Sequence, residues 1–344
     1  MITDSISKII EGKDLTKEEA EQTMNEIMKG EATEAQIASF LTALRMKGET
    51  VEEIASFARV MRANAIRIIP KVEVFDTCGT GGDKIKTFNV STTVAFVLAG
   101  AGLHIAKHGN RAVTSKAGSA DVLEALGVNL SIQAGEVATC VEKIGIGFLF
   151  APLFHPAMKF AIKPRREIKI RTVFNILGPL TNPFGAKRQI LGVYSKELVP
   201  KMASVLKELD CERGFVVHGL DGLDEVSVTG KTLICEITNK ITKKLISPSS
   251  FGLKKAKVKD ILGGYPQINA KILASILEGE KGARRDMVLV NSSLGLVAGG
   301  KASNLKDGVE VAKESIDSGN ALKKLKTLIK ESKGDMHKLE SFLS

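Results

Sequence analysis

The sequence contains no tryptophan and only two tyrosines among its 344 residues, and aromatic residues make up 5% of the chain. Proteins that bind single-stranded nucleic acid need aromatic side chains on which bases stack. The net charge of +10 is therefore poor evidence for a nucleic-acid partner. The four cysteines, Cys78, Cys140, Cys211 and Cys235, show no Cys-x-x-Cys spacing and no zinc-ligand spacing with the five histidines. We expect neither disulfides nor zinc.

Long apolar runs are also missing. No segment approaches the ~18 uninterrupted apolar residues of a membrane span. The start at Met1 to Asp4 lacks a basic region followed by an apolar one, so no secretory signal is visible. The lysines between 313 and 330 fit a solvated helix face better than a binding surface. We expect a cytoplasmic protein with no membrane partner and no nucleic-acid partner.

The pattern at the start of the chain is helical. Three capping boxes, Thr16 to Glu19, Thr33 to Gln36 and Thr50 to Glu53, each predict a helix start, and Gly30 and Gly48 stand where helices should end. We expect residues 1–70 to form a small all-helical domain, joined by a helical segment around 160–183. Short helices with apolar faces commonly bury them against a neighbour, so this layer is also a candidate dimer interface.

From Val72 onward, short apolar runs alternate with helical patterns, which predicts an α/β fold with a central, largely parallel sheet over residues 71–344. The expected strands are Val72 to Asp76, His104 to Lys107, Gly147 to Phe150, Ile190 to Tyr194 and Gly214 to His218. An antiparallel pair, Glu225 to Val228 and Thr232 to Cys235, is expected around Thr229-Gly230. The expected helices are Thr92 to Ala101, Ser119 to Leu126, Leu198 to Leu209, Ala270 to Leu277, Asp286 to Ala298 and Leu305 to Lys330.

A glycine-rich turn from Asp76 to Asp83 leads into a helix-like run that opens at Asn89. Its glycines allow the backbone to approach a ligand closely, and a helix N-terminus offers unpaired N–H groups. This predicts a phosphate-binding loop. The Gly-Lys-Ser/Thr ending of a P-loop is absent, and the glycine spacing is not that of a dinucleotide fold.

Lys107 to Asp121 form a second loop between a predicted strand and a predicted helix, rich in Gly, Ser, Asn and basic residues. Lys107, Arg111 and Lys116 offer positive charge, and Ser115 and Ser119 offer hydroxyls. In α/β sheets ligands bind at the carboxyl ends of strands. Both loops should therefore face one ligand, although a solvated surface loop would also explain the charges.

Two further segments carry charged groups suited to ligands. Asp224 and Glu225 follow a predicted strand, and a short acidic loop opposite a phosphate suits Mg²⁺, although Asp-Gly turns are also common hairpin connectors. Arg165 could clamp a carboxylate with its rigid guanidinium fork. A salt bridge with Glu167 or a helix C-terminus explains Arg165 equally well from the residues alone.

Together, these four stretches resemble the anthranilate phosphoribosyltransferases along nearly the whole chain, in the family's order. The resemblance implies a nucleoside-phosphorylase-like fold and a homodimer through the helical domains. It also implies transfer of the phosphoribosyl group of 5-phosphoribosyl 1-diphosphate (PRPP) to the amine of anthranilate in tryptophan biosynthesis. Two Mg²⁺ ions per subunit are expected.

The family's site residues carry over by matching position. PRPP would contact Gly79, Gly82, Asp83, Thr87, Asn89, Ser91, Thr92, Lys107 and Ser119. Anthranilate would contact Gly79, His108, Asn110, Arg165 and Pro179, and the metal ligands would be Ser91, Asp224 and Glu225. No general base is assigned, since His108 could accept a proton or only shape the pocket. Thr114, Ala117 and Lys169 depart from the family's usual residues, and Ala117 loses one possible phosphate contact.

Two other functions are alternatives to this one. A pyrimidine nucleoside phosphorylase has a loop similar to residues 107–121, but it uses inorganic phosphate without magnesium and lacks the Asp224-Glu225 pair. A nucleic-acid-binding protein would explain the charge but not two organised phosphate loops.

Overall fold

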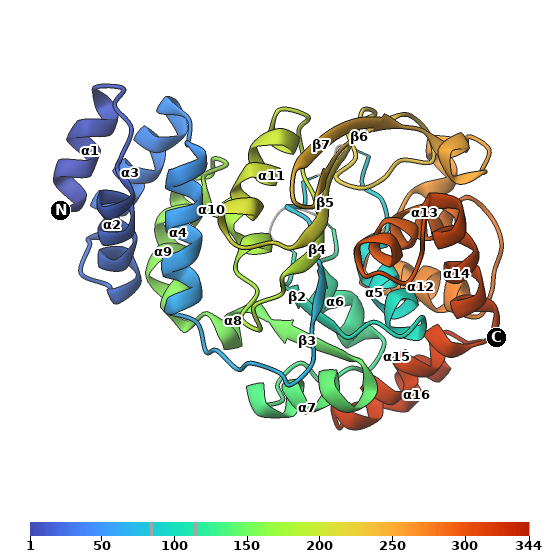
Figure 1. Ribbon diagram of the computed structural model, residues 1–344. Coiled ribbons are helices and arrows are strands. Elements are labelled where there is room, and N and C mark those ends of the chain that lie inside the picture. Colours follow the sequence, from blue (N-terminus) through green and yellow to red (C-terminus); the bar gives the residue numbers. More distant parts are fainter. Residues whose placement is uncertain (83–84, 113–115, 344) are drawn as a thin grey trace.

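The computed structural model describes residues 1–82, 85–112 and 116–343 (Figure 1). Its first four helices are α1 (Ile2–Ile10), α2 (Lys17–Lys29), α3 (Glu34–Lys47) and α4 (Val51–Ala63). The three capping boxes are confirmed, because Thr16, Thr33 and Thr50 each accept a backbone N–H at the start of α2, α3 and α4. Gly30 ends α2 in the left-handed conformation, at φ 75°. These four helices form a layer at one end of the molecule.

A seven-stranded sheet occupies the centre, in the order β3-β2-β1-β4-β5-β6-β7. Its strands are β1 (Phe75–Thr77), β2 (Ile105–Gly109), β3 (Ile146–Phe150), β4 (Arg188–Gly192), β5 (Arg213–Gly219), β6 (Thr232–Ile237) and β7 (Ile241–Ile246). The first five pair in parallel, and β6 and β7 are antiparallel. Strands β2 and β3 lie on one side of β1, and the next strand in the sequence, β4, pairs with the other side of β1. The carboxyl ends of β1 and β4 therefore form a topological switch point, where α/β sheets bind ligands.

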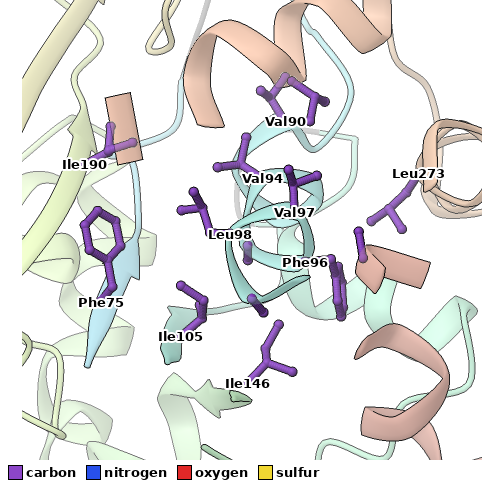
Figure 2. Close-up of a cluster of buried hydrophobic side chains, with 14 of the residues drawn as sticks. Phe75, Val90, Val94, Phe96, Val97, Leu98, Ile105, Ile146, Ile190 and Leu273 are labelled. Atoms are coloured by element: carbon purple, nitrogen blue, oxygen red, sulfur yellow. The ribbon is translucent and has the colours of Figure 1, made fainter. Parts of the chain in front are cut away.

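Alternate residues of the strands enter two different hydrophobic cores. Ile190 and Phe215 belong to the core beneath α5 (Val90–Gly100), whereas Leu191 and Val216 belong to the core shared with α1 to α4 and α11 (Leu198–Glu208). Figure 2 shows α5 surrounded by apolar side chains. Apolar residues on every side of a helix indicate complete burial, and the N-terminus of α5 is thereby held against the sheet.

The other α-helices are α6 (Ser119–Ala125), α7 (Ala134–Ile144), α8 (Ala151–Phe154), α9 (Lys159–Ile168), α10 (Phe174–Leu177), α12 (Pro266–Leu277), α13 (Ala283–Ala298), α14 (Leu305–Asp317), α15 (Asn320–Glu331) and α16 (Met336–Glu340). Short 3-10 turns are η1 (Pro156–Met158), η2 (Gly178–Leu180), η3 (Pro248–Phe251) and η4 (Val258–Ile261). Helix α9 packs against α2 and α3, so a later part of the chain returns to the N-terminal layer. None of the helices in the described part of the chain is long and apolar enough to span a membrane.

Two predicted elements are wrong. Glu225 to Val228 is not a strand, because the Ser227 hydroxyl donates to Asp221 and accepts the N–H groups of Thr229 and Gly230. Such local side-chain bonds compete with a strand ladder, and the hairpin instead joins β6 and β7. The single helix expected from Leu305 to Lys330 is two helices, since Gly319 adopts φ 76° between α14 and α15.

Candidate active site

The glycine turn and the acidic loop meet at the switch point. The Thr80 N–H donates to the Gly192 carbonyl at 2.8 Å, which ties the turn to the end of β4. A Cβ on Gly79 would lie 3.3 Å from Asp224 Oδ2, and a Cβ on Gly192 would overlap the Asp224 carbonyl oxygen. Glycine at these two positions is what allows the loops to approach. The expectation that the acidic pair faces the glycine turn is thus met for Asp224.

Lys107 brings a buried positive charge to this junction. Its side chain, 3% exposed, donates from Nζ to the Thr77 carbonyl at 2.6 Å and approaches the Ser91 hydroxyl at 3.3 Å. Ser91 also shares a small cavity with Gly79 and Glu225. A lysine bonded to neutral oxygens keeps its charge available for an anion in the same place.

The N-terminus of α5 has no side-chain cap, although Asn89 stands at the N-cap position. The amide of Asn89 instead donates to the Ala117 carbonyl at 3.2 Å and accepts from Asn269 at 2.8 Å. The first N–H groups of α5 therefore receive no bond from the N-cap side chain, which suits an anionic ligand. Thr87 forms a β-bridge with Leu262, while Thr92 is 1% exposed.

The second loop is held by its own ion pairs. Arg111 donates to both carboxylate oxygens of Glu124, at 2.6 and 3.0 Å, so its charge is already paired, contrary to its expected availability for a phosphate. Lys116 lies 5.3 Å from the centre of the Tyr265 ring. Ser119 is the first residue of α6, and Asn110 accepts the Arg111 N–H. Asp83, Thr114 and Ser115 lie outside the described residues.

Two histidines lie side by side next to this loop. The rings of His108 and His155 are 5.1 Å apart, and burial lowers the pKa of His108 to about 3 and that of His155 to about 4. Both are neutral near pH 7. His108 Nδ1 lies 3.1 Å from the Gly178 carbonyl, which accepts only, so Nδ1 carries the proton. The Nε2 atom is then an acceptor, buried without a hydrogen-bond partner in the described part of the chain.

Arg165 lies in the last turn of α9, with its guanidinium 5.0 Å from the centre of the Phe174 ring. Burial lowers its pKa. No ion pair joins it to Glu167 or to another carboxylate among residues 1–82, 85–112 and 116–343. The salt-bridge alternative therefore fails, whereas the helix C-terminus alternative is met, since Arg165 stands in the last turn of α9. Its half-buried guanidinium has no carboxylate partner among the described residues and can also attract an anion. Lys169, φ 51°, is exposed and ends α9.

The donor groups at this junction suit Mg²⁺ better than they suit a metal that is bound by protein side chains alone. In the described residues, no group of three or more His, Cys, Asp or Glu side chains could hold a metal. Asp224 and Glu225 offer two carboxylates beside the Ser91 hydroxyl. Mg²⁺ commonly takes one or two carboxylates and completes its shell with water and substrate phosphates, which is the donor set this junction can supply.

Comparison with known proteins agrees with this site. The family "Glycosyl transferase family, helical bundle domain" matches residues 3–65, and "Glycosyl transferase family, a/b domain" matches residues 71–322. Anthranilate phosphoribosyltransferase of Pelotomaculum thermopropionicum is 55% identical over 331 residues, covering 96% of each chain. That of Geobacter sulfurreducens is 54% identical, covering 96% of this chain and 99% of its own. This chain belongs to the anthranilate phosphoribosyltransferase family.

Solved structures of anthranilate phosphoribosyltransferase share the fold. The Thermus thermophilus enzyme superposes with a TM-score of 0.92 at 42% identity, covering 96% of this chain and 99% of its own. The Saccharomyces cerevisiae enzyme in complex with PRPP and Mg superposes with a TM-score of 0.89 at 33% identity, covering 96% and 98%. The expected fold class, a small helical domain with a larger α/β domain, is confirmed. The enzyme is a glycosyltransferase that transfers a phosphoribosyl group to anthranilate.

Sequence reasoning missed two groups that shape this anthranilate phosphoribosyltransferase site. Asp76 is fully buried, and burial raises its pKa to about 6. It accepts the His108 N–H and an Asn182 amide at 3.2 and 2.8 Å, so it joins β1, β2 and the segment after η2. His155 was the second omission. Nothing in its sequence surroundings indicated that its ring would lie beside that of His108.

The neutral state of His155 predicts an acid-sensitive contribution to stability. Its pKa is about 4 in the folded protein against 6.5 when unfolded, so unfolding takes up a proton between these values. As the pH falls through the middle of this range, the wild type should lose about 1.4 kcal/mol of unfolding free energy per pH unit relative to His155→Gln. Urea unfolding at pH 7, 6 and 5 would measure this, with the 93% exposed His337→Gln as the control. A constant difference between wild type and His155→Gln would contradict the prediction.

Proposed function

We propose that the junction of the glycine turn, the α5 N-terminus and the acidic loop binds PRPP. The observation that carries this proposal is the meeting of Asp224, Gly79 and buried Lys107 at one switch point. The proposed PRPP contacts are Gly79, Gly82, Asp83, Thr87, Asn89, Ser91, Thr92, Lys107 and Ser119. Helix N–H groups and Lys107 would hold the phosphates.

Ser91, Asp224 and Glu225 are the proposed ligands of two Mg²⁺ ions per subunit. Mg²⁺ would stabilise the negative charge that develops on the departing diphosphate. The protein's part is to hold the two carboxylates opposite the phosphate loop, which the close approach at Gly79 and Gly192 permits. The yeast relative crystallised with PRPP and Mg supports the pairing of donor and metal.

Anthranilate is proposed to contact Gly79, His108, Asn110, Arg165 and Pro179. The Arg165 guanidinium would pair with the carboxylate of anthranilate, because it is half-buried and has no carboxylate partner in the described protein. His108 Nε2 would accept an N–H of the aryl amine and orient it. The yeast relative in complex with 4-fluoroanthranilate supports an anthranilate-type ligand at this site.

The proposed reaction needs positioning more than acid–base catalysis. The amine nitrogen of anthranilate attacks C1 of the ribose, and the bond from C1 to diphosphate breaks. The amine then gives its proton to water or to the departing diphosphate. A His108 pKa of about 3 makes this histidine a weak base, so its role is hydrogen bonding. Lys107 and the α5 N-terminus stabilise the leaving charge. Aligning the two substrates supplies the remaining rate acceleration.

Loss of anthranilate fluorescence tests this function directly. Purified protein should consume anthranilate when PRPP and Mg²⁺ are both present, and chelation of Mg²⁺ should stop the reaction. Thymidine or uridine cleavage in phosphate buffer, with no loss of anthranilate fluorescence, would instead indicate a nucleoside phosphorylase.

We also propose a division into a helical domain, residues 1–70 with the returning segment at 160–183, and an α/β domain, residues 71–344, in a cytoplasmic homodimer. A groove of about 640 Å³ on α1 and α3 supports the dimer. Ile10 and Met46, 71% and 84% exposed, line it. Exposed apolar grooves of this kind commonly mark protein–protein contacts.

Replacing Ile10 and Met46 together by Lys should convert the dimer to a monomer, because two charges would have to be buried at the interface. Light scattering after size-exclusion chromatography would report the mass. Leu245→Lys, an exposed apolar site on β7, is the matched control and should leave the dimer intact. A wild type that is monomeric throughout the micromolar range would contradict the proposal.

A further inference from the structure

A buried asparagine behind the acidic loop has no place in the site described so far. Asn291 lies in α13, 65 residues after Val226 and 1% exposed. Its Oδ1 accepts the Val226 N–H at 2.9 Å, and its Nδ2 donates to the Val226 carbonyl at 3.1 Å. The same Nδ2 donates to the Met287 carbonyl, one turn earlier in α13, at 2.8 Å.

These bonds hold the residue that follows Glu225. Val226 is fully buried, and both polar groups of its backbone are bonded by a single side chain. This fixes the backbone at Val226 and therefore the direction in which Glu225 projects. Asn291 and Glu225 also line the same small cavity, together with Ser91 and Gly79.

The two bonds from the Asn291 side chain to the Val226 backbone form a clamp. This clamp requires both a donor and an acceptor on one short side chain. Asparagine supplies both, and the third bond to Met287 keeps the amide from rotating. Helix α13 is a rigid support, because every residue from Met287 to Ala298 is buried. The Val226 backbone would otherwise have a buried N–H and a buried carbonyl to satisfy inside the apolar core.

We propose that Asn291 is a positioning residue that sets the Mg²⁺ affinity of the acidic pair. It does so by fixing the backbone that carries Glu225, without itself touching the metal. The inference rests on the proposed metal-binding role of Asp224 and Glu225. Replacing a residue that orients metal ligands without touching the metal typically changes metal affinity or activity by 10–100-fold.

The substitution Asn291→Ser should remove the bonds to Val226 and keep a bond within α13. A serine hydroxyl in a helix can donate to the carbonyl one turn earlier, here that of Met287, but it is too short to bond Val226. At saturating PRPP, the Mg²⁺ concentration for half-maximal activity should rise about 10–100-fold. Binding of Mn²⁺ in the presence of PRPP, followed by electron paramagnetic resonance, should weaken in parallel.

Ser293→Ala is the matched control, since Ser293 is also buried in α13 and its hydroxyl donates to the Leu305 carbonyl at 2.6 Å, away from the acidic loop. It should lower the melting temperature without moving the Mg²⁺ midpoint. Should Asn291→Ser fail to fold, Asn291→Thr, which keeps more of the side-chain volume, is measured by the same criteria.

Asp224→Ala, measured in parallel, distinguishes the two possible failures. If Asp224→Ala shifts the midpoint and Asn291→Ser does not, within about twofold, the role of Asn291 is refuted and the metal site stands. If Asp224→Ala leaves metal dependence unchanged, the proposed metal site is refuted, and the inference about Asn291 falls with it.

Discussion

Replacing Asp224 and Glu225 together by Ala is expected to lower kcat/KM by about 10³-fold or more and to leave a residual rate that no longer responds to Mg²⁺. The reason is that these carboxylates are the acidic groups facing the glycine turn, where the diphosphate would leave. A Mg²⁺ titration of the anthranilate fluorescence assay would measure both effects.

The control for this change removes two other carboxylates, that of Glu212 just before β5 and that of Glu236 in β6. Glu212 and Glu236 pair with surface lysines Lys187 and Lys244. Their double replacement by Ala alters net charge equally and should leave the metal response intact. Wild-type Mg²⁺ dependence in the Asp224, Glu225 variant would show that the metal is held elsewhere.

Arg165→Ala should raise the KM for anthranilate roughly 10–100-fold while changing the KM for PRPP little. A hydrogen bond to a charged group contributes about 1.5–3 kcal/mol, which corresponds to this range. The guanidinium has no carboxylate partner in the described protein, so removing it breaks no internal salt bridge.

Arg166→Ala is the matched control, because Arg166 stands in the same turn of α9 and is exposed. Both KM values should remain near those of the wild type. Equal increases in the two KM values for Arg165→Ala would refute its assignment to anthranilate and indicate a general disturbance of α9.

Local patterns in the sequence predicted much of this molecule. The capping boxes at Thr16, Thr33 and Thr50 predicted three helix starts correctly, because such a box is satisfied within four residues of chain. The five parallel strands were placed to within a few residues from their short apolar runs. The glycine turn was recognised for the same reason, since Gly81 and Gly82 adopt φ 68° and 84°, a local property that favours glycine.

Contacts between residues far apart in the chain could not be predicted from such local patterns. Asn291 bonds the residue after Glu225 from another helix altogether. The strand expected at Glu225 to Val228 failed instead for a local reason, because the Ser227 hydroxyl accepts the N–H groups of Thr229 and Gly230. Arg111 looked free in sequence and is paired with Glu124. His155 gave no signal until the fold placed its ring beside that of His108.

The sequence by itself determined the helical start, the α/β pattern, the glycine turn and the family to which this chain belongs. Only the tertiary structure decided which charges remain available to a ligand, which histidines are neutral, and what holds the acidic pair in place. The physical reason is that a side chain's pKa and its hydrogen-bond partners depend on burial and on groups far away in the chain. Helix caps and glycine turns depend only on their near neighbours.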